Sequence, residues 1–385
     1  MTLETAGPAI DETLVRALPK AEVHVHLEGC FDLADLLELA KAAGERLPGP
    51  AATLFDVDTH DVPAGASALS AFLRFLDWEG GLVRTPEQAA RAAYRFAARE
   101  SASGVRYADV IINPTHWGAW HGRLGALFAA FAAGLDEAEQ DGLCVVNLCA
   151  SLLRQQSPAE AAELVDWIVE ARPPRLVALS IDGDERAAGR TGPRFAEAFG
   201  RAADAGLRRT VHAGESSGPR GVWDALDLLR AERIDHGVRA VEDPALLRRL
   251  ADSQVPLGVC PRSNLALGLY PDRASHPLPA LRAAGVAVTV NTDDPAAMGY
   301  RLESEWVACA DAYGWGLAEL AGLARASMAA SFAPPELQAA LQADVNRFVA
   351  ARTRSPNGSP GPADYPARPE GPNPSHGPVP TGDVE

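Results

Sequence analysis

Residues 176–237 read LVALSIDGDERAAGRTGPRFAEAFGRAADAGLRRTVHAGESSGPRGVWDALDLLRAERIDHG and show the alternation on which the predicted architecture rests. Three short apolar runs, 176–182, 209–213 and 233–237, each end in a polar cluster. Stretches rich in Ala, Leu, Arg and Glu at helical spacing lie between them. Strands that alternate with helices in this way indicate a parallel sheet joined by crossover helices.

The same alternation continues on both sides of this stretch. Eight strand-like runs over about 270 residues predict an α/β fold, a (β/α)₈ barrel of the TIM type. The five further runs are Val23–Leu27, Val105–Ile112, Cys144–Leu153, Val255–Cys260 and Val286–Asp293. Helical composition is expected in Pro158–Glu170, Arg194–Ala205, Gly221–Ala231, Pro244–Asp252 and Pro277–Ala284, and after the last strand in Glu303–Asn346.

The chain between the first two strands is far longer than one crossover helix requires. It contains two helical-looking stretches, Phe31–Ala43 and Ser67–Gly80. It leaves from the end of the first strand, where barrel enzymes attach the lids of their active sites. We therefore expect extra helices inserted after the first strand, covering the mouth of the barrel.

Composition excludes several classes of protein. The 385 residues are 47% hydrophobic and 22% charged, which suits a large globular core. The net charge of −16 makes nucleic acid and membrane surfaces poor partners. Five scattered cysteines without CxxC spacing, and a beginning of the chain without basic or apolar leader character, favour the cytoplasm.

The end of the chain differs from the rest. Nine prolines and five glycines fall within residues 355–385, with no hydrophobic periodicity. Such a segment buries too little apolar surface to offset its ordering entropy. We divide the chain into a barrel at 1–354 and a disordered Pro/Gly-rich tail at 355–385.

Polar side chains gather at the ends of the predicted strands, where such a barrel carries its chemistry. The first strand ends His24-Val25-His26-Leu27-Glu28, and both imidazoles face the barrel interior because residues two apart share a face. Three other strands end in His212-Ala213-Gly214-Glu215, Asp235-His236-Gly237 and Asn291-Thr292-Asp293-Asp294-Pro295. Singly, each has an ordinary structural explanation, such as a helix N-cap for Asp294 or a core hydrogen bond for His236. Together they could supply three histidines and one carboxylate for a single zinc ion, with further groups for proton transfer.

In this order, these stretches resemble the adenosine deaminase family of zinc hydrolases, the mononuclear purine-deaminase branch of the amidohydrolase barrels. The resemblance runs from about Leu18 to Asn346 and leaves out only the tail. It also includes Leu18-Pro-Lys-Ala-Glu22, Ser180-Ile-Asp-Gly-Asp-Glu185, Cys260-Pro-Arg-Ser-Asn264 and Ser275-His-Pro-Leu278.

The resemblance implies a role for each strand-end residue. One zinc ion per chain would be bound by His24, His26, His212 and Asp293, and it would lower the pKa of its water to about 7. Glu215 would protonate ring N1 of the purine, and His236 would orient the water and take or hold its proton. Asp294 would accept a hydrogen bond on the N7 side if N7 is protonated, and the backbone N–H of Gly183 would address N3. Structural alternatives are a helix cap for Asp294 and a turn for Gly183.

Glu28 is a departure from many members of the family, which carry Asp two residues after the second histidine, in contact with the ribose 5′-hydroxyl. Adenine-preferring and some modified-nucleoside members carry Glu there. The expected reaction is zinc-dependent hydrolysis of a 6-aminopurine nucleoside, adenosine or a close relative, to the 6-oxopurine and ammonia. The alternative is deamination of free adenine, because the longer side chain reaches further into the pocket.

Three rival functions are less well supported. Binuclear amidohydrolases commonly bridge their metals with a carboxylated lysine at the end of the fourth strand, where this chain has Ser180-Ile-Asp-Gly183. Zinc deaminases of the cytidine type use an HxE and PCxxC signature, whereas Cys260-Pro261 of this chain has the reverse order and no partner cysteine. A non-catalytic binding protein on the same scaffold would be expected to have lost a ligand or the acid, and none is missing. The cluster Arg262-Ser263-Asn264 could equally be a loop anchor.

Overall fold

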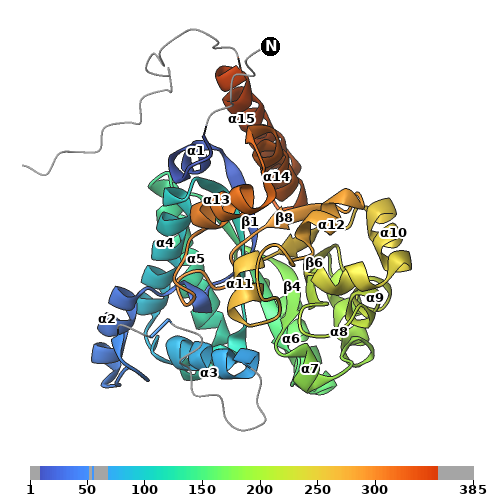
Figure 1. Cartoon of the computed structure of the whole chain (residues 1–385). Coiled ribbons are helices and arrows are strands. Elements are labelled where there is room, and N and C mark those ends of the chain that lie inside the picture. Colours follow the sequence, from blue (N-terminus) through green and yellow to red (C-terminus); the bar gives the residue numbers. More distant parts are fainter. Residues whose placement is uncertain (1–8, 52–53, 56–67, 354–385) are drawn as a thin grey trace, which may run out of the picture.

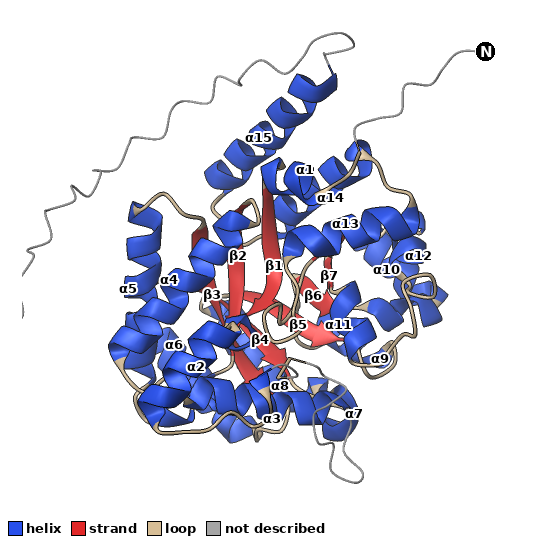
Figure 2. Ribbon diagram, turned by 60° about the vertical axis from the view of Figure 1, so that its left-hand side comes forward, coloured by secondary structure: helices blue, strands red, loops and turns tan. Residues whose placement is uncertain are grey.

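The computed structural model describes residues 9–51, 54–55 and 68–353, and its core is the predicted (β/α)₈ barrel (Figures 1 and 2). Eight strands pair in the order of the sequence, and every pair is parallel. They are β1 (Lys20–His26), β2 (Val105–Ile112), β3 (Val145–Leu153), β4 (Leu176–Asp182), β5 (Arg208–Ala213), β6 (Arg233–His236), β7 (Leu257–Val259) and β8 (Val288–Val290). The fold class is therefore confirmed.

The barrel is nearly closed by a seam between the end of β1 and the chain just beyond β8. Val25 forms an isolated parallel bridge with Asp293. The N–H of His26 donates to the carbonyl of Asp293 at 2.8 Å, and the N–H of Asp293 donates to the carbonyl of His24 at 3.1 Å. The seam thus holds three of the predicted site residues side by side through the backbone.

Helices form the outer layer, and several begin where the sequence signals a start. Thr85 and Ser157 cap α4 (Pro86–Ala102) and α6 (Pro158–Ala171) with their side chains, and a proline follows each. The helices between successive strands are α5 (Leu124–Gln140), α6 (Pro158–Ala171), α7 (Glu185–Ala188), α8 (Gly192–Asp204), α9 (Arg220–Asp227), α10 (Pro244–Ser253), α11 (Pro261–Ala266) and α12 (Leu278–Ala283). Within the described residues, no helix is long and apolar enough to cross a membrane.

The insertion after the first strand is also present. Its described elements are the short 3-10 helix η1 (Glu28–Cys30), α2 (Leu33–Ala43), α3 (Ala68–Gly81) and α4 (Pro86–Ala102), which leads into β2. In Figures 1 and 2, α2 and α3 lie at the opposite end of the barrel from α1 (Glu12–Ala17) and α15 (Pro335–Thr353). The extra helices thus lie at the end where the strands carry the predicted site.

The boundaries differ from the sequence prediction in several places. β7 and β8 have three residues each, because Pro261 starts α11 directly after β7 and the chain turns at Asp293 with a left-handed φ of 66°. The predicted helical stretch at 303–346 is three helices, α13 (Leu302–Tyr313), α14 (Leu317–Ala330) and α15. Gly314, in the left-handed conformation, ends the first of these. The predicted tail and Ser67 lie outside the described residues.

Candidate active site and metal centre

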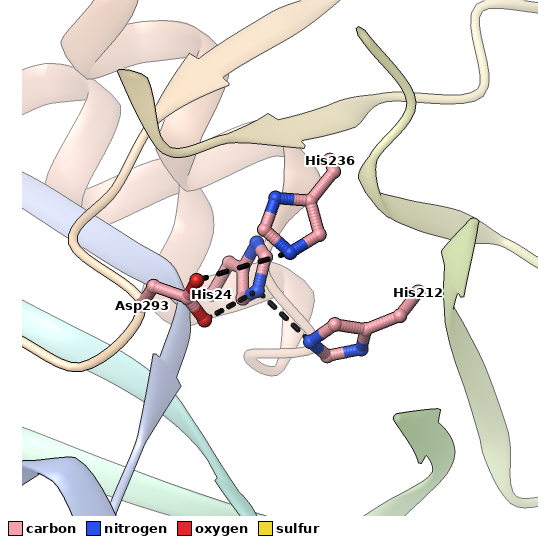
Figure 3. A group of neighbouring side chains, drawn as sticks. All are labelled: His24, His212, His236 and Asp293. Atoms are coloured by element: carbon pink, nitrogen blue, oxygen red, sulfur yellow. Dashed lines mark hydrogen bonds and ion pairs between the residues drawn. The ribbon is translucent and has the colours of Figure 1, made fainter. Parts of the chain in front are cut away.

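Four buried side chains from four strand ends converge in the barrel mouth (Figure 3). His24, His212, His236 and Asp293 each offer one ligand atom, and these atoms all lie within 4.8 Å of one another. The Nε2 atom of His24 is 3.1 Å from Nε2 of His212 and 3.3 Å from Oδ1 of Asp293. Ring nitrogens and a carboxylate oxygen at such distances are a donor set suited to a metal ion.

His26 belongs to the same group. Its Nε2 lies 3.0 Å from Nε2 of His212 and 3.4 Å from Oδ1 of Asp293. The structure therefore brings together all four of the residues expected to bind the metal. His236 lies beside them, with its Nε2 3.8 Å from the other oxygen of Asp293.

Backbone geometry directs these side chains inward. His212 pairs with Asp235, and Ala213 pairs with His236, in the register between β5 and β6. His236 and Asp293 have positive φ angles of 69° and 66°, a region that non-glycine residues rarely occupy. Such backbone conformations concentrate at functional sites.

Hydrogen bonds to the far side of the cluster orient the ligand atoms. Nδ1 of His24 is 2.7 Å from the carbonyl of Gly258, so it carries the proton and leaves the Nε2 lone pair free. The hydroxyl of Ser263 donates to Oδ2 of Asp293 at 2.7 Å. On the other side, Nδ1 of His212 has no hydrogen-bond partner among the described residues and faces Oδ2 of Asp235 at 3.6 Å.

Burial sets the charge states that metal binding needs. Burial and the neighbouring imidazoles hold the pKa of His212 well below its ordinary value, and burial also lowers the pKa of His26. For Asp293, the histidines outweigh burial and hold the pKa well below its usual range. Neutral imidazoles beside an ionised carboxylate are the forms that bind zinc.

His24 shows that the cluster attracts positive charge. Burial lowers its pKa, but the carboxylates of Asp235 and Asp293 outweigh this effect and raise the pKa to about 9. In the absence of a metal, His24 would hold a proton at neutral pH. A divalent cation would replace that proton, so the residues present fit the metal that the sequence predicted.

Glu215 meets the cluster from the loop after β5. Burial, followed by the carboxylates of Asp293 and Glu185, raises its pKa well above the usual value. Its Oε1 lies 3.5 Å from Nε2 of His236. This raised pKa favours the protonated acid, which is the form that a proton donor requires.

A small cavity separates this group from α3. Leu69, Phe72, Leu73 and Leu76 of α3 lie on one side, and the strand-end residues lie on the other. Gly183, with φ 99°, and Asp294 both line the cavity. The volume of the cavity is about 30 Å³, enough for about two waters.

Asp294 has one carboxyl oxygen, Oδ1, without a hydrogen-bond partner among the described residues. Burial and the adjacent Asp293 raise its pKa well above the usual value. A Cβ atom on Gly29 would lie 2.1 Å from Oδ1, so only glycine lets η1 approach this carboxyl. Asp294 is thus a buried carboxyl group that lines the cavity and whose raised pKa favours the protonated form.

Glu28 is fully buried in η1, and it is not among the residues that line the cavity. Its Oε1 accepts hydrogen bonds from the Asn113 N–H at 2.8 Å and from the indole N–H of Trp117 at 2.6 Å. Its Oε2 has no partner among the described residues. Burial raises the pKa of Glu28 to about 7, against the opposing effects of His116 and Trp117.

Comparison with known proteins identifies the family of the chain. The sequence model of a family described as adenosine deaminase matches residues 19–348. The chain belongs to the adenosine deaminase family. It is therefore an enzyme, a purine aminohydrolase with a TIM barrel.

Named relatives of this family member cover nearly all of the barrel. An adenine deaminase from Cupriavidus metallidurans is 36% identical over 344 residues, 89% of this chain and 94% of that one. The crystal structure of an adenine deaminase from Arthrobacter aurescens has a TM-score of 0.80 and 31% identity, covering 86% of this chain and 99% of that one. An amidohydrolase from Burkholderia ambifaria with bound zinc has a TM-score of 0.80 at 26% identity, covering 92% and 97%.

Sequence analysis of this deaminase missed His116. It lies in η4 (Pro114–His116), after β2, and it lines the cavity. Its Nδ1 is 2.7 Å from Oδ1 of Asp77 on α3, so it connects the barrel mouth to the covering helix. A histidine soon after a strand end was the available signal. The intervening Pro114-Thr115 breaks the strand, so the strand pattern does not predict where the His116 side chain points.

A second missed feature is a hydrogen-bond chain behind His236. The Leu278 N–H donates to Nδ1 of His276 at 3.2 Å, so Nε2 of His276 carries its proton and lies 3.1 Å from Oδ1 of Asn264. The amide nitrogen of Asn264 then faces Nδ1 of His236 at 3.4 Å. Asn264 is thus more than the loop anchor that the sequence left open, because it contacts a predicted catalytic residue.

Glu185 is the third feature that the sequence did not reveal. Its Oε1 accepts from the N–H of Gly214 at 3.0 Å. Its Oε2 accepts from the N–H of Glu215 at 2.8 Å, of Ser216 at 3.2 Å and of Ser217 at 3.3 Å. One buried carboxylate therefore holds the backbone of the loop that carries Glu215.

We expect Glu185→Gln to lower both stability and turnover. The amide replaces one acceptor oxygen with a donor, which leaves at least one loop N–H unpaired at a cost of about 1–3 kcal/mol. We expect kcat to fall about tenfold or more, because small displacements of a catalytic group reduce rates strongly. Chemical denaturation and steady-state kinetics measure the two effects, with Glu197→Gln on the exposed face of α8 as control. Wild-type values for both would show that Glu185 does not support the loop.

Proposed function

We propose that this enzyme is an adenine deaminase, which hydrolyses adenine to hypoxanthine and ammonia with one zinc ion per chain. The observation that carries the proposal is the convergence of His24, His26, His212 and Asp293 on one point. A protonated Glu215 and a neutral His236 adjoin that point in the same cavity. Hydrolytic deamination needs an activated water and an acid at a single site.

The four converging residues would hold the metal through three imidazole nitrogens and one carboxylate oxygen. When bound, a divalent cation such as zinc supplies hydroxide at neutral pH by lowering the pKa of water to about 7. The contacts of Ser263 with Asp293, and of Gly258 with His24, keep these donors in their ligating orientation.

Glu215 would donate its proton to ring N1 of adenine. Carbon 6 of an aminopurine is a poor electrophile, and protonation of the adjacent nitrogen lets the ring accept negative charge as that carbon becomes tetrahedral. The raised pKa of Glu215 keeps the proton available at neutral pH. Its loop is fixed by Glu185, which favours a defined direction for the transfer.

His236 would orient the attacking water. Burial and the charge of His24 lower its pKa, so the ring is neutral. In the hydrogen-bond chain through Asn264, Nδ1 of His236 is the acceptor. The proton of the His236 ring is then on Nε2, which faces Glu215. Of the two roles expected from the sequence, this arrangement favours holding a proton over taking one.

Asp294 and Gly183 would bind the purine ring. The raised pKa of Asp294 favours its protonated form, which would donate to the N7 lone pair rather than accept from a protonated N7. The backbone N–H of Gly183 would address N3. Both residues line the cavity beside Glu215.

Three observations favour adenine over the nucleoside that the sequence analysis put first. Two of the three relatives described above, from Cupriavidus metallidurans and Arthrobacter aurescens, carry the name adenine deaminase. The cavity beneath α3 is small, and the free base needs less displacement of that helix than a nucleoside does. Glu28 does not line the cavity as it stands, but its Oε2 is buried without a partner among the described residues, and a base that enlarges the cavity towards η1 would offer it an imidazole N–H. Adenosine carries ribose in place of its N9 hydrogen, and buried groups left without a partner reject such analogues strongly.

Variants of Glu28 test this choice. We expect Glu28→Asp to lower kcat/KM for adenine and to raise the ratio of adenosine to adenine activity at least about tenfold, since the shorter carboxyl withdraws from the base. Glu28→Gln keeps the length of the side chain and replaces one acceptor oxygen with an amide nitrogen. It therefore distinguishes the effect of side-chain length from that of the carboxylate. Kinetics on both substrates provide the measurement. An unchanged ratio in both variants would remove Glu28 from substrate selection.

A further inference from the structure

A second pocket lies behind the loop that carries Glu215. It is formed by α7, the beginnings of α8 and α9, the end of β5 and the residue that follows β3, and the three helices adjoin in Figure 1. The volume of this pocket is about 360 Å³, whereas that of the cavity beneath α3 is about 30 Å³. Four arginines line it: Arg154, Arg186, Arg190 and Arg220.

The pocket carries an excess of positive charge in a chain whose net charge is −16. Two carboxylates, Glu185 and Asp224, line it beside the four arginines. Asp224 forms ion pairs with two guanidinium groups. Arg190 donates to it at 2.7 and 2.9 Å, and Nε of Arg220 lies 3.2 Å away. Arg186 has no ion pair among the described residues, and its guanidinium donates to the carbonyl of Ser216 at 3.1 Å.

Arg154 is buried at the back of this pocket and is incompletely paired. Only 4% of its surface is exposed. One terminal nitrogen donates to the Thr191 hydroxyl at 2.6 Å and the other to the carbonyl of His212. Its nearest carboxylate oxygen, on Glu185, is 3.9 Å away and also accepts a loop N–H. The Nε–H has no partner among the described residues, which is costly for a buried cation.

Two helix beginnings add to the positive potential. α8 starts at Gly192 and α9 at Arg220, and Gly192 and Gly221 both line the pocket. A Cβ atom on Gly192 would lie 2.6 Å from Cβ of Asp224, and one on Gly221 would lie 2.8 Å from Oε1 of Glu185. The absence of side chains lets the backbone approach these groups, and helix N-termini favour anions.

We propose that this pocket binds the phosphate group of a small molecule, either inorganic phosphate or a phosphomonoester. Guanidinium groups with paired N–H donors match the oxygens of phosphate, and a dianion would neutralise the excess charge of the four arginines. The volume leaves room for more than the phosphate itself. The site is separate from the predicted metal centre, although His212 and Glu185 border both regions.

A ligand in this pocket would contact the groups that support the catalytic loop. Arg154 donates to the backbone of His212, and Glu185 holds the N–H groups of Gly214 to Ser217. A phosphate bound here would thus contact residues that hydrogen-bond to the backbone of His212, a predicted metal ligand, and of Glu215, the predicted proton donor. This adjacency makes the pocket a candidate regulatory site.

Calorimetric titration of the metal-loaded enzyme tests the proposal. The probes are inorganic phosphate and ribose 5-phosphate, with ribose and potassium chloride at equal ionic strength as controls. We expect saturable binding of phosphate-bearing probes only. Arg190→Gln/Arg220→Gln should weaken it at least about tenfold, because charged hydrogen bonds are lost. The matched control Arg91→Gln/Arg347→Gln removes two exposed arginines that pair with carboxylates elsewhere.

A single variant guards against misfolding of the double one. Arg186→Gln leaves the ion pairs of Asp224 intact and should also weaken binding. Equal affinity for the two probes would identify free phosphate as the natural chemistry, and tighter binding of ribose 5-phosphate would identify a phosphomonoester. No saturable binding by the wild type, or equal binding by all pocket variants, as would occur for phosphate on the metal, would overturn the proposal.

Discussion

Glu215→Gln should lower kcat for adenine about 10²–10⁴-fold, the usual contribution of a positioned proton donor. Glutamine keeps the shape of the side chain but cannot deliver a proton to N1. The raised pKa of Glu215 favours the protonated form in the wild type, so loss of this proton affects the reaction directly. Since the proton stabilises the transition state more than the bound substrate, KM should change little.

The kinetics need two accompanying measurements. Metal content should stay at the wild-type level, because Glu215 is not among the four residues that would hold the ion. Glu242→Gln, which changes an exposed glutamate in an ion pair with Arg239, should leave kcat unaltered. An unchanged kcat in Glu215→Gln would exclude the residue as the acid, and loss of metal would make it a ligand instead.

His212→Ala should abolish metal binding and, with it, essentially all activity. His212 lies 3.1 Å from His24 and 3.0 Å from His26, so its removal opens the centre of the donor set. Metal analysis should give one ion per wild-type chain and much less in the variant. His121→Ala, which changes an exposed histidine, is the control.

Chelation gives an independent form of the same test. Exhaustive removal of metal should eliminate wild-type activity, and one equivalent of zinc should restore it. Melting temperature should fall on chelation, because an ion that binds only the folded chain stabilises it. Full activity in the chelated enzyme, or two ions per active chain, would contradict the site.

Much of the fold could be predicted because it depends on local patterns. Apolar runs followed by helical stretches indicated all eight strands, and the spacing of His24 and His26 placed both imidazoles on one strand face. The strand-end position then brought distant segments together, since the carboxyl ends of parallel strands in a barrel share one rim. The four predicted metal ligands meet for this reason.

Other features depend on contacts that no local pattern encodes. Glu185 was visible only as part of a motif, and its four backbone contacts arise because α7 lies against the loop after β5. His116 reaches the cavity through the turn of η4. The short β7 and β8 reflect early turns at Cys260 and Asp293, where tertiary geometry overrides strand propensity.

Ammonia release from adenine and from adenosine, measured side by side on the zinc-loaded wild type, tests the central claim most directly. We expect kcat/KM for adenine to exceed that for adenosine at least about 100-fold, because a buried acceptor that loses its partner disfavours the analogue strongly. The product of the adenine reaction should be hypoxanthine. Equal or greater kcat/KM for adenosine would contradict the assignment of this enzyme as an adenine deaminase.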